Sequence, residues 1–519
     1  MRIGFWLAAA IAVAGWATTA SAGPRLKVTL DAGAEATSGR LLVFARALPT
    51  SGKPPARVDS DEVSDDAPSA EAAMEVDHIA PGGSVEVDLD QISYPQPFSR
   101  LPPGDYAVQA VLDVNHDYNY GGRGAGDVLS PVATLRLPFA EGAGLRLGEV
   151  LTARDPWAPA GATPARLAEL AQARPHMTPL AFTSPALSAF WGRPTVMRGW
   201  VLTPPGYQAG GRTTYPTVYF THGFGSNTTR LVVTGAQLYQ QMVSGAAPAM
   251  IWVLLDESSP TGTHEFADSV NNGPWGQALT TELIPRLERD YRMDGRPSGR
   301  FLTGHSSGGW ATLWLQTRYP KLFGGTWSTA PDPSDFHDFT NIDLYAPGAN
   351  AYRRADGAPT PLMRQGDKTV LTFQQYTTQE DVQGRYGGQI RSFDWVFSPR
   401  GPDGQPMALF NRTTGAVDPV VAAYWRDHYD IAARLQRDWP KLKPDLDGKI
   451  HVAVGTADTF YLDGPAHRLQ AVLDGLGAKS RFEFIEGRTH FDLLKIGDNT
   501  MGLLNRFAGE MYAVARPPN

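Results

Sequence analysis

Residues 25–152 alternate apolar and polar positions in short stretches that turn residues separate. A period of two is typical of strands with one buried face, and several such strands in a row are typical of an antiparallel sandwich. The segment 49–83 interrupts this pattern with acidic, Ser and Pro residues, so we expect a solvated loop there. We therefore predict a small antiparallel β-sandwich-like domain over residues 23–152. Its alternating positions are Leu26/Val28/Leu30, Val85/Val87/Leu89, Tyr106/Val108/Ala110/Leu112 and Leu135/Leu137.

A Pro- and Ala-rich connector at residues 153–185 leads to a different pattern over residues 186–519, where continuous apolar runs alternate with stretches of helical period. This alternation predicts a mostly parallel sheet with helices on both faces. The segment 333–440 fits the alternation poorly and is rich in aromatic residues, so we predict a cap-like insertion there. The expected strands are Gly199–Leu202, Thr217–Thr221, Met250–Leu255, Arg300–Thr303, Gly325–Ser328, Ile450–Val454 and Arg481–Ile485, and the clearest helices are Gln277–Tyr291, Gly308–Tyr319 and Ala466–Leu476.

Composition narrows the classes of function. Of 519 residues, 42 % are apolar and 19 % charged, which suits a folded chain with a large core. The formal net charge is −7, so we expect neither nucleic acid nor a membrane surface as a partner. The chain has no Cys, which excludes disulfides, thiol nucleophiles and Cys-ligated metals. The sequence leaves the oligomeric state open.

The first 22 residues have the pattern of a secretory signal peptide. A single charge, Arg2, precedes the apolar run 3–13, and the small residues Ala20-Ser21-Ala22 stand before Gly23. The apolar run is too short to span a bilayer comfortably. We expect cleavage after Ala22 and a secreted or periplasmic location in a bacterium.

The sharpest motif is Gly304-His305-Ser306-Ser307-Gly308, a G-x-S-x-G sequence between an expected strand and an expected helix. A nucleophile elbow requires this context, because small residues two positions on either side let the backbone turn tightly around the serine. The N–H groups at the start of the next helix then face charge that develops on the substrate. The motif predicts that Ser306 is a nucleophile.

A serine hydroxyl needs a base, and in folds with this elbow the chain order is serine, acid, histidine. Among the downstream histidines, only His490 follows the last expected strand. Asp458 stands just past the expected strand 450–454 and is the predicted acid, with Asp463 as the alternative. The carboxylate is expected to orient His490 without taking its proton.

The loop His222-Gly223-Phe224-Gly225 follows the expected strand 217–221 and has the small, bendable character of an oxyanion loop. We predict that the N–H of Phe224, or alternatively that of Gly223, acts together with the N–H of Ser307. Weaker candidates for contact with the substrate are His264, Trp275 and His305, and an ordered loop is the alternative interpretation for the first two.

One further set of residues has the spacing of metal ligands. Asp113, Asn115 and Asp117 are spaced as oxygen ligands are in calcium loops. Tyr118 and Gly124 replace the Gly and Glu expected at the sixth and twelfth positions of such a loop. A hydrophilic turn is therefore favoured over calcium, and no metal is predicted.

In this order the motifs resemble the esterase D branch of the α/β-hydrolases, the putative esterase family. The branch includes feruloyl and acetyl-xylan esterases, enterochelin esterases, S-formylglutathione hydrolases and the mycolyltransferases of the antigen 85 group. The resemblance implies an α/β-hydrolase fold, and two features depart from short members of the branch: the N-terminal β-region and the aromatic insertion. It covers about residues 186–505 and rests on 222–225, Glu282-Leu283-Ile284-Pro285, 304–309, 455–458 and 487–491.

We expect a secreted serine esterase that needs no cofactor and hydrolyses a small-molecule or carbohydrate-linked carboxylic ester through an acyl-enzyme on Ser306. An acyltransferase or a serine peptidase on the same fold is the alternative, and a non-catalytic binding protein is a further one. All of the predicted chemistry lies between His222 and His490, so the sequence assigns no reacting residue to 25–152.

Overall fold

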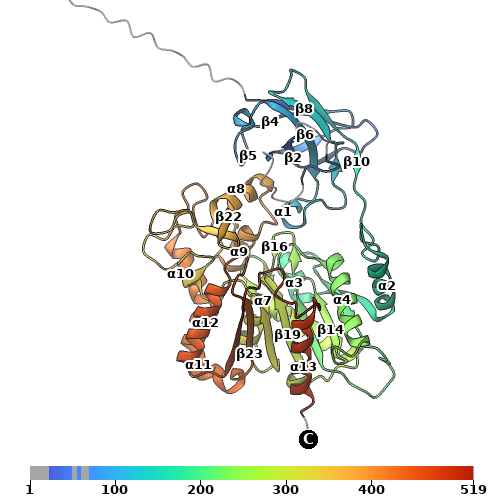
Figure 1. Cartoon of the computed structure of the whole chain (residues 1–519), viewed down its shortest axis with the longest axis vertical. Coiled ribbons are helices and arrows are strands. Elements are labelled where there is room, and N and C mark those ends of the chain that lie inside the picture. Colours follow the sequence, from blue (N-terminus) through green and yellow to red (C-terminus); the bar gives the residue numbers. More distant parts are fainter. Residues whose placement is uncertain (1–22, 49–54, 60–68, 518–519) are drawn as a thin grey trace, which may run out of the picture.

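The computed structural model describes residues 23–48, 55–59 and 69–517. The N-terminal strands lie at the top of Figure 1 and the α/β region lies below them. After Glu149–Val150 (β10), an extended segment runs down beside the molecule to Pro164–Ala173 (α2) (Figure 1). The predicted signal peptide, residues 1–22, lies outside the described residues.

The N-terminal β-region, residues 25–150, contains two sheets whose buried side chains share one hydrophobic cluster. Leu26, Val28 and Leu30 of its first strand are all buried, as a period of two requires. One sheet has the order β4-β1-β9 and the other β10-β7-β6-β2-β3-β5, with β8 beside β6. The strands are β1 Arg25–Leu30, β2 Thr37–Ala47, β3 Ser69–Ile79, β4 Ser84–Asp88, β5 Ser93–Tyr94, β6 Gly104–Asp113, β7 Val128–Leu129, β8 Ala133–Leu137 and β9 Gly144–Leu147.

Part of the segment 49–83, expected to be a solvated loop, belongs to this fold. Ser69–Ile79 (β3) pairs with β2 in antiparallel register, and its buried residues include the small Ala70, Ala72 and Ala73. Small residues bury little surface each, so the strand lacks the alternation of bulk that marks its neighbours. Asp59 is also buried, where it binds Arg57 and Arg123.

The α/β region has one sheet of eight strands in the order β11-β12-β14-β13-β19-β20-β23-β24. The six strands from β14 to β24 run parallel, and β11 and β12 are antiparallel at one edge. β11 lies inside the predicted connector 153–185, so the sheet begins at Met177. The strands are β11 Met177–Thr183, β12 Val196–Leu202, β13 Thr217–Thr221, β14 Ile251–Leu255, β19 Arg300–His305, β20 Gly325–Thr329, β23 Ile450–Gly455 and β24 Ser480–Ile485.

Helices cover both faces of this sheet, which explains its continuous apolar runs. Val218 and Phe220 of β13 join a cluster with α2, α4 and α13, whereas Tyr219 between them joins a cluster with α3, α5, α6 and α7. A strand covered on both sides needs apolar residues at successive positions. The predicted helix 277–291 contains a π-helical turn at Leu279–Leu283. The helices are α3 Pro185–Trp191, α4 Thr228–Val243, α5 Trp275–Ala278, α6 Ile284–Asp290, α7 Ser307–Arg318, α12 Asp463–Gly475 and α13 Gly502–Ala515.

The segment between β20 and β23 packs its aromatic residues into one cluster with α7. Phe397 and Trp425 lie against each other, and Phe397 also contacts Trp310 of α7. In Figure 1 the first half of this segment lies beside the N-terminal region. Its elements are β21 Pro361–Gln365, β22 Lys368–Thr372, α8 Phe373–Gln383, α9 Gln389–Phe397, α10 Pro419–His428 and α11 Ile431–Leu446.

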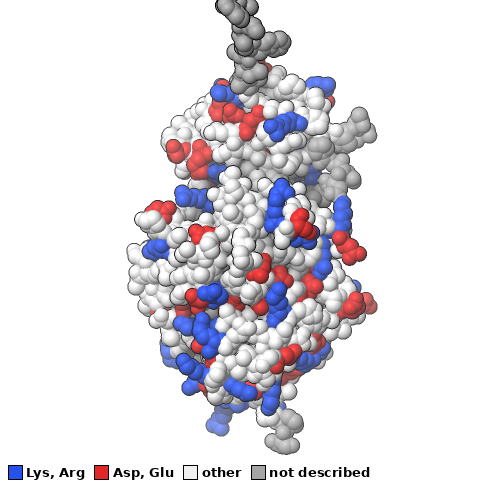
Figure 2. Space-filling model, turned by 90° about the vertical axis from the view of Figure 1, so that its left-hand side faces the viewer, with Lys and Arg blue, Asp and Glu red and all other residues white. Residues whose placement is uncertain are grey.

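The surface carries charges of both signs. On the face shown in Figure 2, basic and acidic side chains are interspersed over both regions. Among the described residues, none of the helices is both long enough and apolar enough to cross a bilayer.

Candidate active site

Ser306 stands at a sharp junction between β19, which ends at His305, and α7, which begins at Ser307. Its backbone has φ of 61° and ψ of −125°, a conformation that non-Gly residues seldom adopt. Such strain persists only where the surrounding structure imposes it, and it is concentrated at functional sites. The backbone geometry is therefore that of the predicted elbow.

The glycines of the motif are required by close backbone contacts. A Cβ at Gly304 would lie 2.3 Å from the carbonyl oxygen of Gly308. A Cβ at Gly308 would lie 2.4 Å from the carbonyl oxygen of Thr221, at the end of β13. Any larger residue at either position would push the elbow away from the neighbouring strand.

His490 and Asp458 meet, although 32 residues separate them in sequence. Nδ1 of His490 lies 2.9 Å from Oδ2 of Asp458, and both side chains are buried. The other oxygen of Asp458 accepts hydrogen bonds from the N–H groups of Phe460 and Leu462. Burial alone would raise the pKa of Asp458, but His490 and these donors outweigh burial and lower it. Asp458 is thus held as a carboxylate.

Asp463, the alternative acid, has a different partner. Its carboxylate lies 2.9 Å from Nη2 of Arg364. The structure thus places Asp458, not Asp463, against His490.

The imidazole of His490 lies beside the elbow. The rings of His490 and His305 have centroids 4.4 Å apart, and His305 directly precedes Ser306. Burial lowers the pKa of His305 to about 3, and its Nδ1 lies 3.0 Å from the Thr329 hydroxyl. His305 is therefore an uncharged neighbour of the candidate base.

The hydroxyl of Ser306 makes its hydrogen bond to an unpredicted residue, Asp332. Oγ of Ser306 donates to Oδ1 of Asp332 at 3.4 Å, and Oγ of Ser307 donates to Oδ2 at 2.7 Å. Burial raises the pKa of Asp332 to about 6. Asp332 follows β20, next to β19 in the sheet, so its place reflects strand order rather than a motif.

The loop after β13 lies directly against Ser306. A Cβ on Gly223 would be 3.0 Å from Cβ of Ser306. Nε2 of His222 lies 3.0 Å from Oδ1 of Asp256, which anchors the start of the loop. Phe224 follows Gly223, so its N–H and that of Ser307, the first residue of α7, belong to the two segments that meet at Ser306. The first N–H groups of a helix have no partner within it.

Two further acids, Glu257 and Glu265, are fully buried near this site, and sequence patterns did not identify them. The carboxyl of Glu257 accepts no hydrogen bond from the part of the chain that the structure describes. Burial raises the pKa of both well above the ordinary value, and neighbouring acids, Asp332 among them, add to the effect. These shifts favour the uncharged acid form, which lowers the cost of burying several carboxyls together.

Two of the predicted substrate contacts lie in the interior. His264 is fully buried and its ring stacks on that of Trp275, with centroids 3.6 Å apart. The indole N–H of Trp275 donates to the carbonyl oxygen of Asn272. Burial lowers the pKa of His264 to about 3. This geometry favours the alternative interpretation, an ordered loop.

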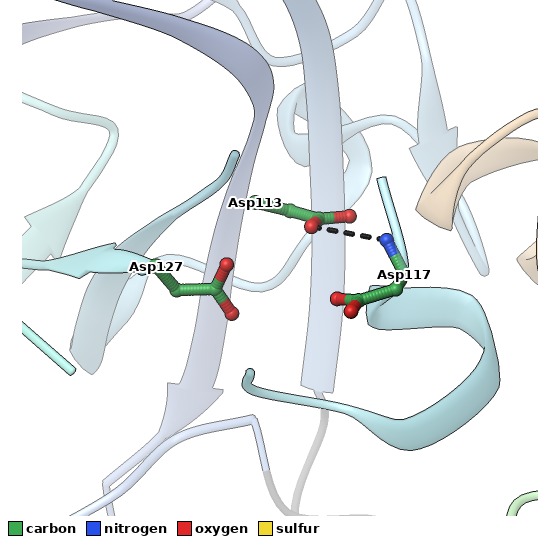
Figure 3. A group of neighbouring side chains, drawn as sticks. All are labelled: Asp113, Asp117 and Asp127. Carbon is green, nitrogen blue, oxygen red and sulfur yellow. Dashed lines mark hydrogen bonds between the residues drawn. The ribbon is translucent and has the colours of Figure 1, made fainter. Parts of the chain in front are cut away.

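At the predicted oxygen-rich turn, the carboxylates that gather are those of Asp113, Asp117 and Asp127, so Asp127 takes the place expected for Asn115 (Figure 3). Asp113, Asp117 and Asp127 bring one carboxylate oxygen each within 4.8 Å of one another. Asn115 donates its side-chain N–H to the carbonyl of Ala125. Asp113 accepts hydrogen bonds from the N–H groups of Asp117 and Tyr118. The cluster thus holds the short helix Tyr118–Gly121 (α1) in place.

The fold is of the α/β-hydrolase type. Three features define it: the order of the strands in the sheet, the strained serine between a strand and a helix, and the loops at the carboxyl ends of the parallel strands. The family described as "Putative esterase" matches residues 194–490, which is more than half of the chain, and the chain belongs to this family. Its class of activity is the hydrolysis of carboxylic esters. No curated protein matches the chain.

Several solved structures are similar to this chain. A ferulic acid esterase is 13 % identical, with a TM-score of 0.38, and the match covers 66 % of this chain and 97 % of that one. A ferulic acid esterase from Anaeromyces mucronatus, in complex with ferulic acid, is 15 % identical, with a TM-score of 0.34 and coverage of 66 % and 89 %. An S-formylglutathione hydrolase from Agrobacterium tumefaciens is 14 % identical, with a TM-score of 0.37 and coverage of 65 % and 94 %.

Proposed function

We propose that this esterase works through Ser306 as nucleophile, His490 as general base and Asp458 as the residue that orients His490. The observation that carries the proposal is the strained backbone of Ser306 at a strand–helix junction, with the Asp458–His490 pair beside it. The pairing of Nδ1 with Asp458 leaves Nε2 of His490 as the nitrogen that exchanges a proton with serine.

In the proposed reaction the Ser306 hydroxyl turns from Asp332 towards His490. Its Oγ forms a bond to the ester carbonyl carbon while Nε2 of His490 takes its proton. The N–H groups of Phe224 and Ser307 stabilise the oxyanion, and His490 then gives the proton to the departing alcohol. Water then attacks the acyl carbon while His490 takes its proton, and His490 returns that proton to Oγ of Ser306 as the bond to the acyl group breaks and the carboxylic acid leaves.

Aromatic side chains next to His490 support an ester with an apolar part. Phe491 is 76 % exposed, which is unusual for a large apolar side chain, and its ring lies 5.9 Å from that of Phe460. Phe460 in turn packs edge-on against His490. We propose that a small-molecule or carbohydrate-linked ester lays its apolar part against Phe491 and Phe460.

The wider organisation is proposed from the sheets and hydrophobic clusters of the fold. Residues 23–152 form a sandwich-like domain, an extended segment leads from it to α2, and residues 333–440 cap the α/β-hydrolase domain. The signal-peptide pattern of residues 1–22 supports export to the periplasm or exterior of a bacterium.

The test replaces the nucleophile. Ser306→Ala is expected to lower kcat for p-nitrophenyl acetate on the order of 10⁶-fold, as loss of a triad serine does elsewhere. The matched control is Ser244→Ala, an exposed serine that donates to the carbonyl of Gln241 at the end of α4. Hydrolysis by Ser306→Ala at the rate of the control would refute the assignment.

A further inference from the structure

A short helix of the N-terminal region, α1, reaches the α/β region (Figure 1). It follows β6 and carries Tyr118, Asn119 and Tyr120. The sequence assigned no chemistry to this region, and the family match begins only at residue 194. The contacts of α1 therefore show what the N-terminal region adds to an esterase.

The start of α1 is held in place by contacts within the N-terminal region. Asp113 accepts hydrogen bonds from two N–H groups at the start of the turn, one of which Figure 3 shows. The ring of Tyr118 packs against Phe44, with centroids 5.6 Å apart, and its hydroxyl donates to the buried Asp59. A turn held by both backbone and side chain presents the next residues in one orientation.

Tyr120 projects from α1 onto the loop after β13. Its ring meets that of Phe224 edge to face, with centroids 4.9 Å apart. Its hydroxyl donates to the carbonyl oxygen of Ser226 at 2.8 Å. Between these two contacts, Gly225 has φ of +75°, and a Cβ there would lie 3.3 Å from the carbonyl oxygen of Tyr120. One side chain thus holds both ends of the segment 224–226.

A second contact keeps α1 from moving away. The side-chain amide of Asn119 donates to the carbonyls of Glu380 and Gly384, at the end of α8. A Cβ on Gly387 would lie 3.2 Å from Cβ of Tyr120. Val382 of α8 packs into the same cluster as Tyr118. Tyr120 is therefore held between the loop after β13 and the insertion.

The hydroxyl of Tyr120 remains a donor at working pH. Burial, with the charge of Asp256 adding to it, holds the pKa of Tyr120 well above its ordinary value. The bond to Ser226 therefore does not depend on pH in the range where an esterase is assayed.

We propose that Tyr120 is a positioning residue that holds the Phe224 N–H at the place where the oxyanion forms. The inference rests on the proposed role of Phe224 in the oxyanion hole. A hole donor is effective only about 2.7–3.1 Å from the developing oxyanion, and a misplacement of about 1 Å can cost roughly 10²-fold in rate. Phe224 lies between Gly223 and Gly225, whose backbones are intrinsically free, so an external support is needed.

The experiment compares two Tyr120 variants with a matched tyrosine. Tyr120→Leu removes the ring contact and the hydroxyl bond, and Tyr120→Phe removes the hydroxyl bond alone. The control is Tyr106→Phe, because Tyr106 lies in the same region and donates to the carbonyl of Pro102, within the N-terminal region. The readouts are kcat and KM for p-nitrophenyl acetate, the Ki of phenylboronic acid, and the melting temperature.

Support of the oxyanion acts in the transition state, so kcat falls and KM does not change. We expect Tyr120→Leu to lose about 10- to 100-fold in kcat, and Tyr120→Phe about threefold. Phenylboronic acid, which forms a tetrahedral adduct on serine, should bind more weakly by a similar factor. Tyr106→Phe should keep the native kcat and Ki.

A native kcat in Tyr120→Leu, with Ser306→Ala inactive, overturns this inference and leaves the proposed function intact. An active Ser306→Ala overturns the proposed function instead. If Tyr120→Leu does not fold, Tyr120→Phe decides: a kcat equal to that of Tyr106→Phe overturns the inference. A loss confined to KM or to the melting temperature also overturns it, because that would be a merely structural role.

Discussion

The α/β region and the N-terminal region contribute to the candidate active site through different kinds of structure. In the α/β region, the segments that follow β13, β19, β20 and β23 meet there because these strands are neighbours in a parallel sheet. In the N-terminal region the turn that carries Tyr120 lies against it, and the Tyr120 hydroxyl donates to the carbonyl of Ser226, 106 positions away. The proposed reacting groups are therefore encoded in local motifs, whereas the proposed support of the oxyanion loop depends on packing between regions.

After replacement of Ser306, the largest fall in kcat is expected from a substitution in the α/β region. Asp458→Asn should lower kcat by roughly 10⁴-fold, because an amide favours the wrong tautomer of His490. Its melting temperature should change far less than its kcat. Steady-state hydrolysis of p-nitrophenyl acetate measures the loss.

Asp463→Asn is the matched control for that change. Asp463 pairs with Arg364 rather than with His490, so its loss should cost about 1 kcal/mol of stability or less and little kcat. If Asp463→Asn is the crippling variant, the acid must be reassigned.

The second prediction concerns stability and pH in the α/β region. Burial raises the pKa of Asp332 to about 6, against about 3.9 in an unfolded chain, so the folded state holds this proton more tightly. The stability that this provides is present below about pH 4 and is lost as pH rises through about 6. Asp332→Asn should remove this loss, which is on the order of 3 kcal/mol.

Urea unfolding at pH 4.5 and 8 (roughly the two ends of this window) measures that difference. The control is Asp105→Asn, an exposed residue of the N-terminal region whose ion pair with Arg136 is solvated. An identical pH dependence in native protein and Asp332→Asn would contradict the burial of a titrating Asp332.

The third and smallest effect tests the contact between the regions. The guanidinium of Arg40 donates to the carbonyls of Val382 and Asp381, which joins β2 to α8. Arg40→Ala should cost about 2 kcal/mol in the free energy of unfolding, since charged hydrogen bonds contribute about 1.5–3. The kcat should fall less than in Tyr120→Leu, because the turn that carries Tyr120 remains.

Arg136→Ala is the control for the same measurement, since its ion pair is exposed and such pairs contribute little. An unfolding free energy that falls equally in both variants would mean that the regions are not joined through Arg40.

Much of the α/β region could be predicted, for a physical reason. A parallel strand covered on both faces needs a continuous apolar run, and the runs at β13, β14, β19 and β23 mark those strands. The sequence did not predict helix α4, because this segment is rich in Thr and Val, which favour strands. It is stabilised instead by packing, and a Cβ at its Gly235 would lie 2.4 Å from Met177.

The residues of the candidate site also differ in how far the sequence predicts them. Ser306, Asp458 and His490 could be placed because each follows a predicted strand in an order that the elbow implies. The places of Asp332, Glu265 and Tyr120 could not be predicted, because their contacts depend on distances across the fold and on burial. Single acids and tyrosines carry no periodicity or spacing from which such contacts follow.

We propose above all that the α/β region supplies the nucleophile through Ser306. The most direct measurement labels the native protein with a fluorophosphonate and maps the modified residue by peptide mass spectrometry. We predict one adduct on Ser306, lost in Ser306→Ala and retained in Ser244→Ala. An adduct on Ser307 or on any other residue, with loss of hydrolysis, would contradict it.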